Sequence, residues 1–297
     1  MVSNKVGIYK QNAPTVHTHK PVMHLNTAFF PILSAGFGLA AFVTGYVLAV
    51  LNDHEEAWFS LISDGGALAP ESCIFGILLN FSAFFWLLTC VSRHYQLLQY
   101  VHFHHGKKQK YRIMTKFMMI VGVLSGIGMS GVACFPEGQV PLAHSLSALL
   151  TFFGSVVYAW CYALMSVVVK PRIVPNWLTI FRVVAVLVVT VAFVCHQVVH
   201  TVRPFVDTLP DGTKPEKPEG PPSGILRFKP DHPYYLNHLI EAIFEWILAC
   251  GSYVITATLC YELRSFEINT LTKDEQRSLF EQNREPKLVS SNFVRKL

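Results

Sequence analysis

The chain has 297 residues, of which 52% are apolar and only 14% are charged, and it carries a formal net charge of +5. Soluble domains are about 25% charged, so the composition excludes a typical soluble protein and predicts one that lies in the lipid bilayer. Membrane topology accounts for the positive excess, and we therefore expect no nucleic-acid partner.

Six mostly apolar segments are each long enough to cross a hydrocarbon core of roughly 30 Å as an α-helix. The first follows a polar tail and has no small-residue cleavage site before Asn52, so we interpret it as a retained helix and not as a signal peptide. The fold class is therefore an all-α integral membrane bundle of six transmembrane helices. We predict spans at residues 29–51, 74–92, 113–133, 142–169, 177–200 and 238–262.

Lysine and arginine gather in the two tails and in the connections that follow the second and fourth spans. The first two connections on the opposite side contain acidic residues but no Lys or Arg. Because cytosolic segments carry the positive excess, we expect both termini in the cytosol. The predicted organisation is a cytosolic tail (1–28), a six-span membrane domain (29–268) and a second cytosolic tail (269–297).

Small residues recur along the first and third spans, from Ser34 to Ala41 and from Gly122 to Gly131. Small residues let helices approach closely, so we expect these two helices to form the packed centre of the bundle. Cys73 and Cys134 mark the non-cytosolic ends of the second and third spans. A disulfide between them stays open, beside the alternative that both are small apolar residues of the bundle.

The third non-cytosolic loop, residues 201–237, has proline throughout its length. Proline removes a backbone donor and clashes with the preceding helical turn. We therefore expect extended or turn structure outside the membrane and no helix.

The sixth span carries His238, Glu241 and Glu245 on one helical face, at i, i+3 and i+7. A charge in the hydrocarbon core costs at least a few kcal/mol, so such residues are a functional hypothesis by default. Two interpretations stay open. Either the stripe is a proton-sensitive, ion-binding or lipid-headgroup site, or it is a hydrogen-bonded anchor with Glu241 at headgroup level and Glu245 buried.

Other ionisable residues are expected at the same depth on the non-cytosolic side. Asp64 and Glu71 lie before and at the start of the second helix, His144 opens the fourth, and His196 and His200 close the fifth. The sequence has no HExxH motif and no nucleophile elbow. We therefore expect no metal and no cofactor.

Arg182 lies a few residues into the fifth span from its cytosolic edge. We expect its long side chain to snorkel to that interface. The alternative is that it turns inward to another helix. Direct pairing with Glu245 would be too long, because the two residues enter from opposite faces of the membrane.

A longer motif runs from Ile62 to Gly76 and includes Asp64 and Glu71. Weaker single matches are Asn80, Arg93, Tyr95, Gln96, His144, Ala148, Phe152, Gly154, Tyr158, Arg182, Glu245, Trp246, Tyr261 and Phe266. With these residues the chain resembles the Frag/DRAM/Sfk family of six-span proteins over about residues 25–268. The resemblance implies a multi-pass protein of lysosomal, endosomal or plasma membranes that regulates autophagy or phosphoinositide signalling.

Our leading hypothesis is a non-enzymatic membrane regulator of the DRAM type, with membrane lipids and a cytosolic or membrane protein as partners. Its candidate polar pocket, which binds a lipid headgroup or sets the bundle geometry, comprises Asp64, Glu71, His144, Arg182, His238, Glu241 and Glu245. The resemblance also covers relatives that remodel GPI lipids. The alternative is therefore a lipid-modifying enzyme with Glu245 or Glu241 as general base and His144 or His238 as its partner. A proton-coupled transporter would need a polar path across the bundle, and the gap between Arg182 and Glu245 argues against one.

Overall fold

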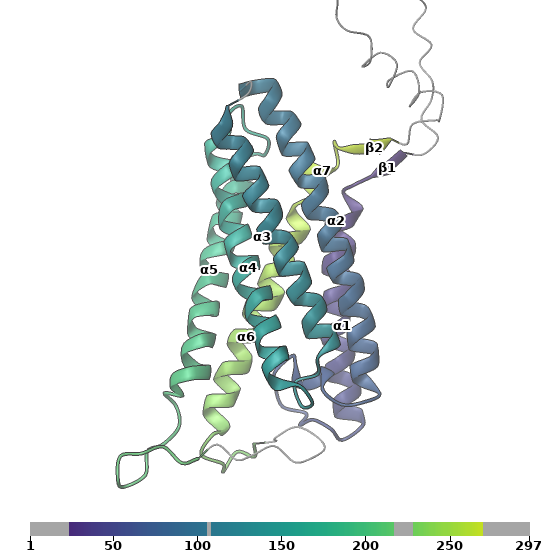
Figure 1. The fold of residues 1–297 in the computed structure, drawn as a ribbon. Coiled ribbons are helices and arrows are strands. Elements are labelled where there is room, and N and C mark those ends of the chain that lie inside the picture. The colour runs from purple at the N-terminus through teal and green to yellow at the C-terminus, as the bar shows by residue number, and fades with distance from the viewer. Residues whose placement is uncertain (1–23, 106–107, 217–227, 270–297) are drawn as a thin grey trace, which may run out of the picture. The chain divides into compact units, whose positions relative to one another are not determined.

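The computed structural model describes residues 24–105, 108–216 and 228–269. In these ranges six helices are long and apolar enough to cross a membrane, the last of them continuing into a short helix α7 (Figure 1). This confirms the predicted fold class. The helices are α1 (Phe29–Leu51), α2 (Glu71–His105), α3 (Gln109–Cys134), α4 (Pro141–Val168), α5 (Asn176–Val202), α6 (Tyr235–Thr258) and α7 (Cys260–Leu263).

Three shorter elements complete the described structure. A 3-10 turn, η1 (Asp64–Gly66), lies between α1 and α2. The strands β1 (His24–Asn26) and β2 (Glu267–Asn269) pair as a two-stranded sheet. Residues 26–267 form one compact unit, whereas most of the predicted tails 1–28 and 269–297 lies outside the described residues.

Each long helix packs against the next one in sequence, and α6 returns to α1, so that the six helices form a closed ring. Helix α4 also contacts α6. The prediction that α1 and α3 form the packed centre is wrong for α3. In its most apolar stretch 33% of the residues are buried, against 44% in the corresponding stretches of α2 and α4. Its small residues serve close approach instead: a Cβ on Gly122 would lie 2.4 Å from the Cys90 sulfur of α2.

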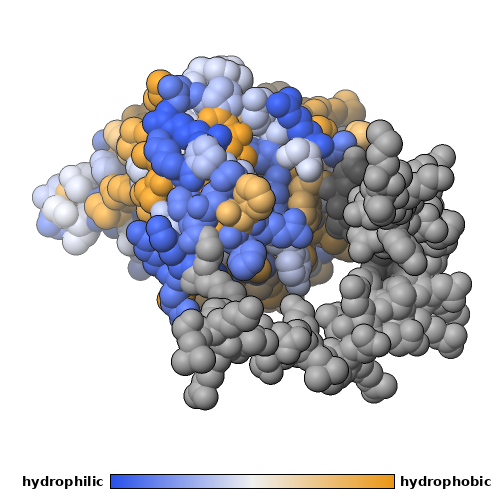
Figure 2. All heavy atoms as spheres, turned by 90° about the horizontal axis from the view of Figure 1, so that it is seen from above, coloured by the Kyte–Doolittle hydropathy of each residue, from blue (hydrophilic) through white to orange (hydrophobic). Residues whose placement is uncertain are grey.

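The outer surface of the bundle is apolar. Large apolar side chains such as Ile77, Phe84, Ile120 and Val191 are each more than half exposed. Figure 2 looks onto one end of the molecule, where hydrophilic residues gather on the end face and hydrophobic ones lie around its edge. This distribution fits a belt of lipid around the helices with water at their ends.

Helix α2 is longer than predicted. It has 35 residues, which at 1.5 Å per residue is about 50 Å and exceeds the hydrocarbon thickness. The prediction ended at residue 92 because polar residues follow. The helix continues because its inner face, with Leu97 and Val101, packs into a core cluster with Tyr111 of α3.

The predicted loop 201–237 is helical at both ends, since α5 ends at Val202 and α6 begins at Tyr235. Between them, the described residues 203–216 and 228–234 contain no helix or strand, as predicted. The Tyr234 hydroxyl donates to the Pro215 carbonyl at 2.7 Å and ties the two parts together. Cys73 and Cys134 are exposed free thiols, so the disulfide that the sequence left open is not formed.

Candidate functional site

Three connections, α1–α2, α3–α4 and α5–α6, lie at one end of the bundle, which we call the loop end (lower end of Figure 1). The opposite end, where α1 begins and α6 runs into α7, is called the terminal end. Six of the seven predicted pocket residues come from elements at the loop end, and only Arg182 does not. The six are Asp64, Glu71, His144, His238, Glu241 and Glu245.

Glu245 is 7% exposed and joins α6 to the first loop. Its Oε2 accepts a hydrogen bond from the Ile62 backbone N–H at 2.8 Å. The neighbouring Trp246 ring N–H donates to the Ser60 carbonyl at 3.0 Å. Glu245 Oε1 receives no hydrogen bond from any described residue, and no described basic side chain forms an ion pair with Glu245. One carboxyl oxygen is therefore structural and the other is available.

Asp64 lies in η1 and is 3% exposed. The double glycine that follows it lets this turn press against α1, since a Cβ on Gly65 would lie 2.9 Å from the Tyr46 backbone nitrogen. Asp64 Oδ2 has no hydrogen-bond partner but lies 3.6 Å from His238 Nε2. Burial, and then the nearby carboxylates of Glu137, Glu55, Glu245 and Glu241, raise the pKa of Asp64 well above its ordinary value.

Glu241, one turn closer to the loop end than Glu245, contacts two histidines of α5. Its Oε1 lies 2.7 Å from His200 Nδ1, and its backbone carbonyl lies 3.4 Å from His196 Nδ1. Glu241 is 8% exposed, while the His200 side chain is 53% exposed. Glu241 is thus buried like Glu245, although the His200 side chain that its carboxylate contacts lies at the surface.

His144 is held in place in the first turn of α4. Pro141, which opens this helix, has the fixed φ angle that suits a helix start. His144 Nδ1 lies 2.7 Å from the Phe135 carbonyl, which can only accept, so Nδ1 carries the proton of this bond. Its Nε2 then faces Glu137, whose Oε2 is 3.9 Å away.

Glu71 begins α2 and is fully buried. It accepts a hydrogen bond from Asn52 Nδ2 at 3.1 Å and bonds to His54 Nδ1. The amino end of a helix favours a negative charge. Glu71 thus anchors the first loop to α2, and it lines neither of the cavities described next.

Two adjoining cavities open at the loop end. The outer one, which we call the vestibule, has a volume of about 200 Å³ and includes Glu137, His144, His196, His200 and Glu241 in its lining. The inner one, the chamber, has a volume of about 70 Å³ and lies between mostly apolar side chains such as Phe42, Phe75, Leu79 and Tyr253. Both are lined by Ser63, His144, Ala148, Phe152 and Glu245.

The size of the cavities limits what they can hold. On the same measure one water needs about 10–15 Å³, so the chamber has room for a short run of methylene groups and the vestibule for a small headgroup. Among the described residues, no three His, Cys, Asp or Glu side chains lie in an arrangement that could hold a metal ion.

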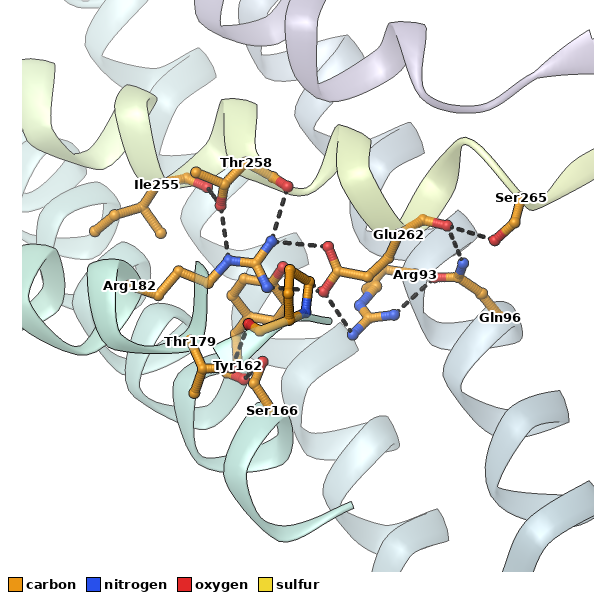
Figure 3. A network of polar contacts seen from close by, with 11 residues as sticks. Arg93, Gln96, Tyr162, Ser166, Thr179, Arg182, Ile255, Thr258, Glu262 and Ser265 are labelled. Carbon is orange, nitrogen blue, oxygen red and sulfur yellow. Dashed lines mark hydrogen bonds and ion pairs between the residues drawn. The ribbon is translucent and has the colours of Figure 1, made fainter. Parts of the chain in front are cut away.

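Arg182 lies at the terminal end and is fully buried, so the prediction that it snorkels to the interface is wrong. It turns inward to the end of α6 (Figure 3). Its two terminal nitrogens donate to the two oxygens of Glu262 at 2.9 and 2.8 Å, and its Nε donates to the Thr258 hydroxyl at 3.0 Å. A fully buried guanidinium is retained only when its charge is paired in this way.

Sequence reasoning overlooked Glu262 and the pairing role of Arg93. Arg93 of α2 lies 3.4 Å from Glu262 and donates to Gln96 at 2.7 Å, and the Tyr162 hydroxyl of α4 also donates to Glu262, at 2.6 Å. The Arg182 guanidinium lies 4.4 Å from the centre of the Tyr162 ring, a cation–π contact. One carboxylate therefore joins α2, α4, α5 and α7. The signal in the sequence was one acid, Glu262, and two arginines, Arg93 and Arg182, each near the cytosolic end predicted for its span.

The fold and the site define a class: an integral membrane protein of six spans, with an acid- and histidine-lined vestibule at one end and a buried ion network at the other. The chain belongs to the Frag1/DRAM/Sfk1/Cwh43P N-terminal domain family, whose model matches residues 26–266. The resemblance seen in the sequence is thereby confirmed.

Several characterised relatives are similar over most of the chain. DNA damage-regulated autophagy modulator protein 1 of Homo sapiens is 30% identical over 250 residues, which are 83% of this chain and 94% of the relative. DNA damage-regulated autophagy modulator protein 2 of Homo sapiens is 27% identical over 75% of this chain and 78% of its own length. The modulator of macroautophagy TMEM150B of Danio rerio is 27% identical over 59% of this chain and 72% of its own length. No solved structure matches the chain.

Proposed function

We propose that this protein is a multi-pass membrane regulator of autophagy and that its vestibule binds the headgroup of a membrane lipid. The regulatory role rests on the relatives, whose names describe autophagy modulators and one of which matches over 94% of its length. The headgroup site rests on one observation above all. Glu245 is buried in a membrane helix, bonds to Ile62 through one oxygen only, and lines both cavities.

The lipid-modifying alternative receives no support from the contacts of His144. In this alternative Glu245 or Glu241 acts as general base with His144 or His238 as its partner, and His238 Nε2 lies 3.6 Å from Asp64. His144 instead bonds to the Phe135 carbonyl and faces Glu137.

Rescue of autophagy in cells that lack the protein tests this proposal. We expect wild-type protein to restore autophagic flux, and Glu245→Gln and Asp64→Asn proteins to fail although they reach the same membrane and fold as stably. If both variants restore flux fully, the loop-end residues are not a functional site. If the wild-type protein itself has no effect on flux, the regulatory role is wrong.

We further propose that both termini, with the tails 1–28 and 269–297, lie in the cytosol and that the protein resides in lysosomal or endosomal membranes. The distribution of Lys and Arg along the sequence supports this orientation. An epitope at either terminus should be accessible after the plasma membrane alone is permeabilised, and the tagged protein should coincide with lysosomal markers. A protected epitope would reverse the orientation.

A further inference from the structure

The residues that line the two cavities indicate which kind of headgroup the vestibule takes. The vestibule lining includes three carboxylates, Glu137, Glu241 and Glu245, and among the described residues no lysine or arginine lines either cavity. An anionic headgroup would face these acids with only the histidines to receive it, and His144, His196 and His200 each already contact a protein oxygen through Nδ1. A neighbouring pocket, which His200 and Glu241 also line, includes Arg203. The Arg203 guanidinium lies 5.9 Å from the centre of the Tyr234 ring.

Glu245 has the geometry of a receptor for a hydrogen-bond donor. It is buried, it lines both cavities, and its Oε1 receives no hydrogen bond from a described residue. A protonated amine has three donors and one positive charge. It would supply the countercharge that a membrane-buried carboxylate lacks, and buried charges persist when they are paired.

Apolar side chains in the vestibule lining support an entrance from the lipid. Leu142, Leu146 and Leu149 of α4 line the vestibule and are also exposed on the outer surface of the bundle, by 73%, 58% and 44%. A molecule dissolved in the bilayer can therefore reach Glu245 from the side. The apolar chamber behind Glu245 continues the path inward and suits a hydrocarbon segment, which a water-soluble amine would leave empty.

We infer that the site takes a single-chain amphiphile with a protonated primary amine, a long-chain base, whose amine pairs with Glu245 in the vestibule and whose first methylene groups enter the chamber. This inference rests on the proposed headgroup site and specifies its ligand class. Glu241 and Glu137 would bind the remaining amine protons or the hydroxyl groups next to the amine.

Photolabelling with a C18 primary amine that carries a diazirine in its chain tests the inference. The full-length protein is purified into phosphatidylcholine nanodiscs, and labelled peptides are located by mass spectrometry. We expect label on chamber residues such as Phe75, Leu79 and Tyr253. Octadecylamine should compete with the label, while octadecanoate, with the same chain, and spermine, a soluble amine, should compete at least about tenfold more weakly.

Three variants locate the determinants. Glu245→Gln should lower the labelling at least about tenfold, because it removes the charge and keeps the shape. Asp211→Asn, an exposed acid of the proline-rich loop, is the matched control and should label like wild type. Ala148→Phe fills the junction of the two cavities and should abolish chamber labelling with every carboxylate intact. If Glu245→Gln fails to fold, the inference is still tested by the competition experiments on the wild-type protein and by the labelling of Ala148→Phe.

Equal competition by octadecanoate, label outside the chamber, or undiminished labelling of folded Glu245→Gln would overturn the inference. Stronger competition by spermine would show a soluble-amine site and also overturn it. If a photoactivatable anionic phospholipid labels the vestibule and the amine does not, the amine inference fails and the headgroup site stands. If no lipid probe gives competed labelling, both fail.

Discussion

The two ends of the bundle treat buried charge in opposite ways. At the terminal end, Arg182 donates to both oxygens of Glu262 and to Thr258, and this network joins four helices. At the loop end, Glu245 accepts one backbone N–H bond through one oxygen and lines two cavities. A buried ion network whose carboxylate is bonded through both oxygens fixes a structure, whereas a half-bonded carboxylate beside a cavity can receive a ligand. The comparison predicts that the terminal end governs stability and the loop end governs function.

Removing the central carboxylate of the terminal end should have the largest effect. Glu262→Gln would leave Arg182 and Arg93 buried without their countercharge, and breaking such a pair costs about 3–5 kcal/mol. The expected results are a much lower melting temperature of the purified protein and poor expression. Glu216→Gln, an exposed acid on the proline-rich loop, is the control and should melt like wild type. Unchanged melting of Glu262→Gln would show that the network is not structural.

Arg182→Lys should have the next largest effect. Lysine keeps the charge but cannot bond to both Glu262 oxygens and to Thr258 at once, since it lacks the planar fork of arginine. We expect a loss of about 1.5–3 kcal/mol, the size of a hydrogen bond to a charged group, measured by thermal melting. Arg172→Lys changes an exposed arginine before α5 and should leave melting unaltered. Equal melting of the two variants would contradict this account of Arg182.

Glu245→Gln should change stability much less. The glutamine oxygen can still accept the Ile62 N–H bond, so the expected cost is under about 1 kcal/mol. Glu245→Ala loses that bond and leaves a buried donor, and should be the less stable of the two. A melting temperature of Glu245→Gln as low as that of Glu262→Gln would remove the distinction between the two ends.

The smallest predicted effect is a dependence of stability on pH at Asp64. Its raised pKa means that the folded protein binds a proton that the unfolded chain, with an ordinary Asp pKa of about 3.9, has already lost. Stability should therefore fall as pH rises from this value through the raised pKa. The groups that face Asp64 are His238, Glu55, Glu137, Glu241 and Glu245. Asp64→Asn should weaken the dependence of the melting temperature on pH above the ordinary Asp pKa of about 3.9, and parallel slopes in wild type and variant would refute the assignment.

The fold could be predicted because its signals are local. Length and apolar composition decide whether a segment spans the bilayer, and all six spans were found. That Glu245, Asp64 and His144 lie at the same end of the bundle also followed from topology alone. The bond between Glu245 and the Ile62 N–H could not be predicted, since it depends on the path of an irregular loop. The partnership of Arg182 with Glu262 was overlooked because it joins residues of two different helices, and pairing across a bundle leaves no periodic trace in the sequence.

The central claim is tested most directly by measuring autophagic flux in cells that lack the protein and instead express the Glu245→Gln variant. The variant must be present at the wild-type level and in the same membrane. The account predicts that this variant melts within a few degrees of wild type (about 1 kcal/mol or less) and yet restores little flux. Full restoration of flux by Glu245→Gln would contradict it, because the loop end would then be structural like the terminal end.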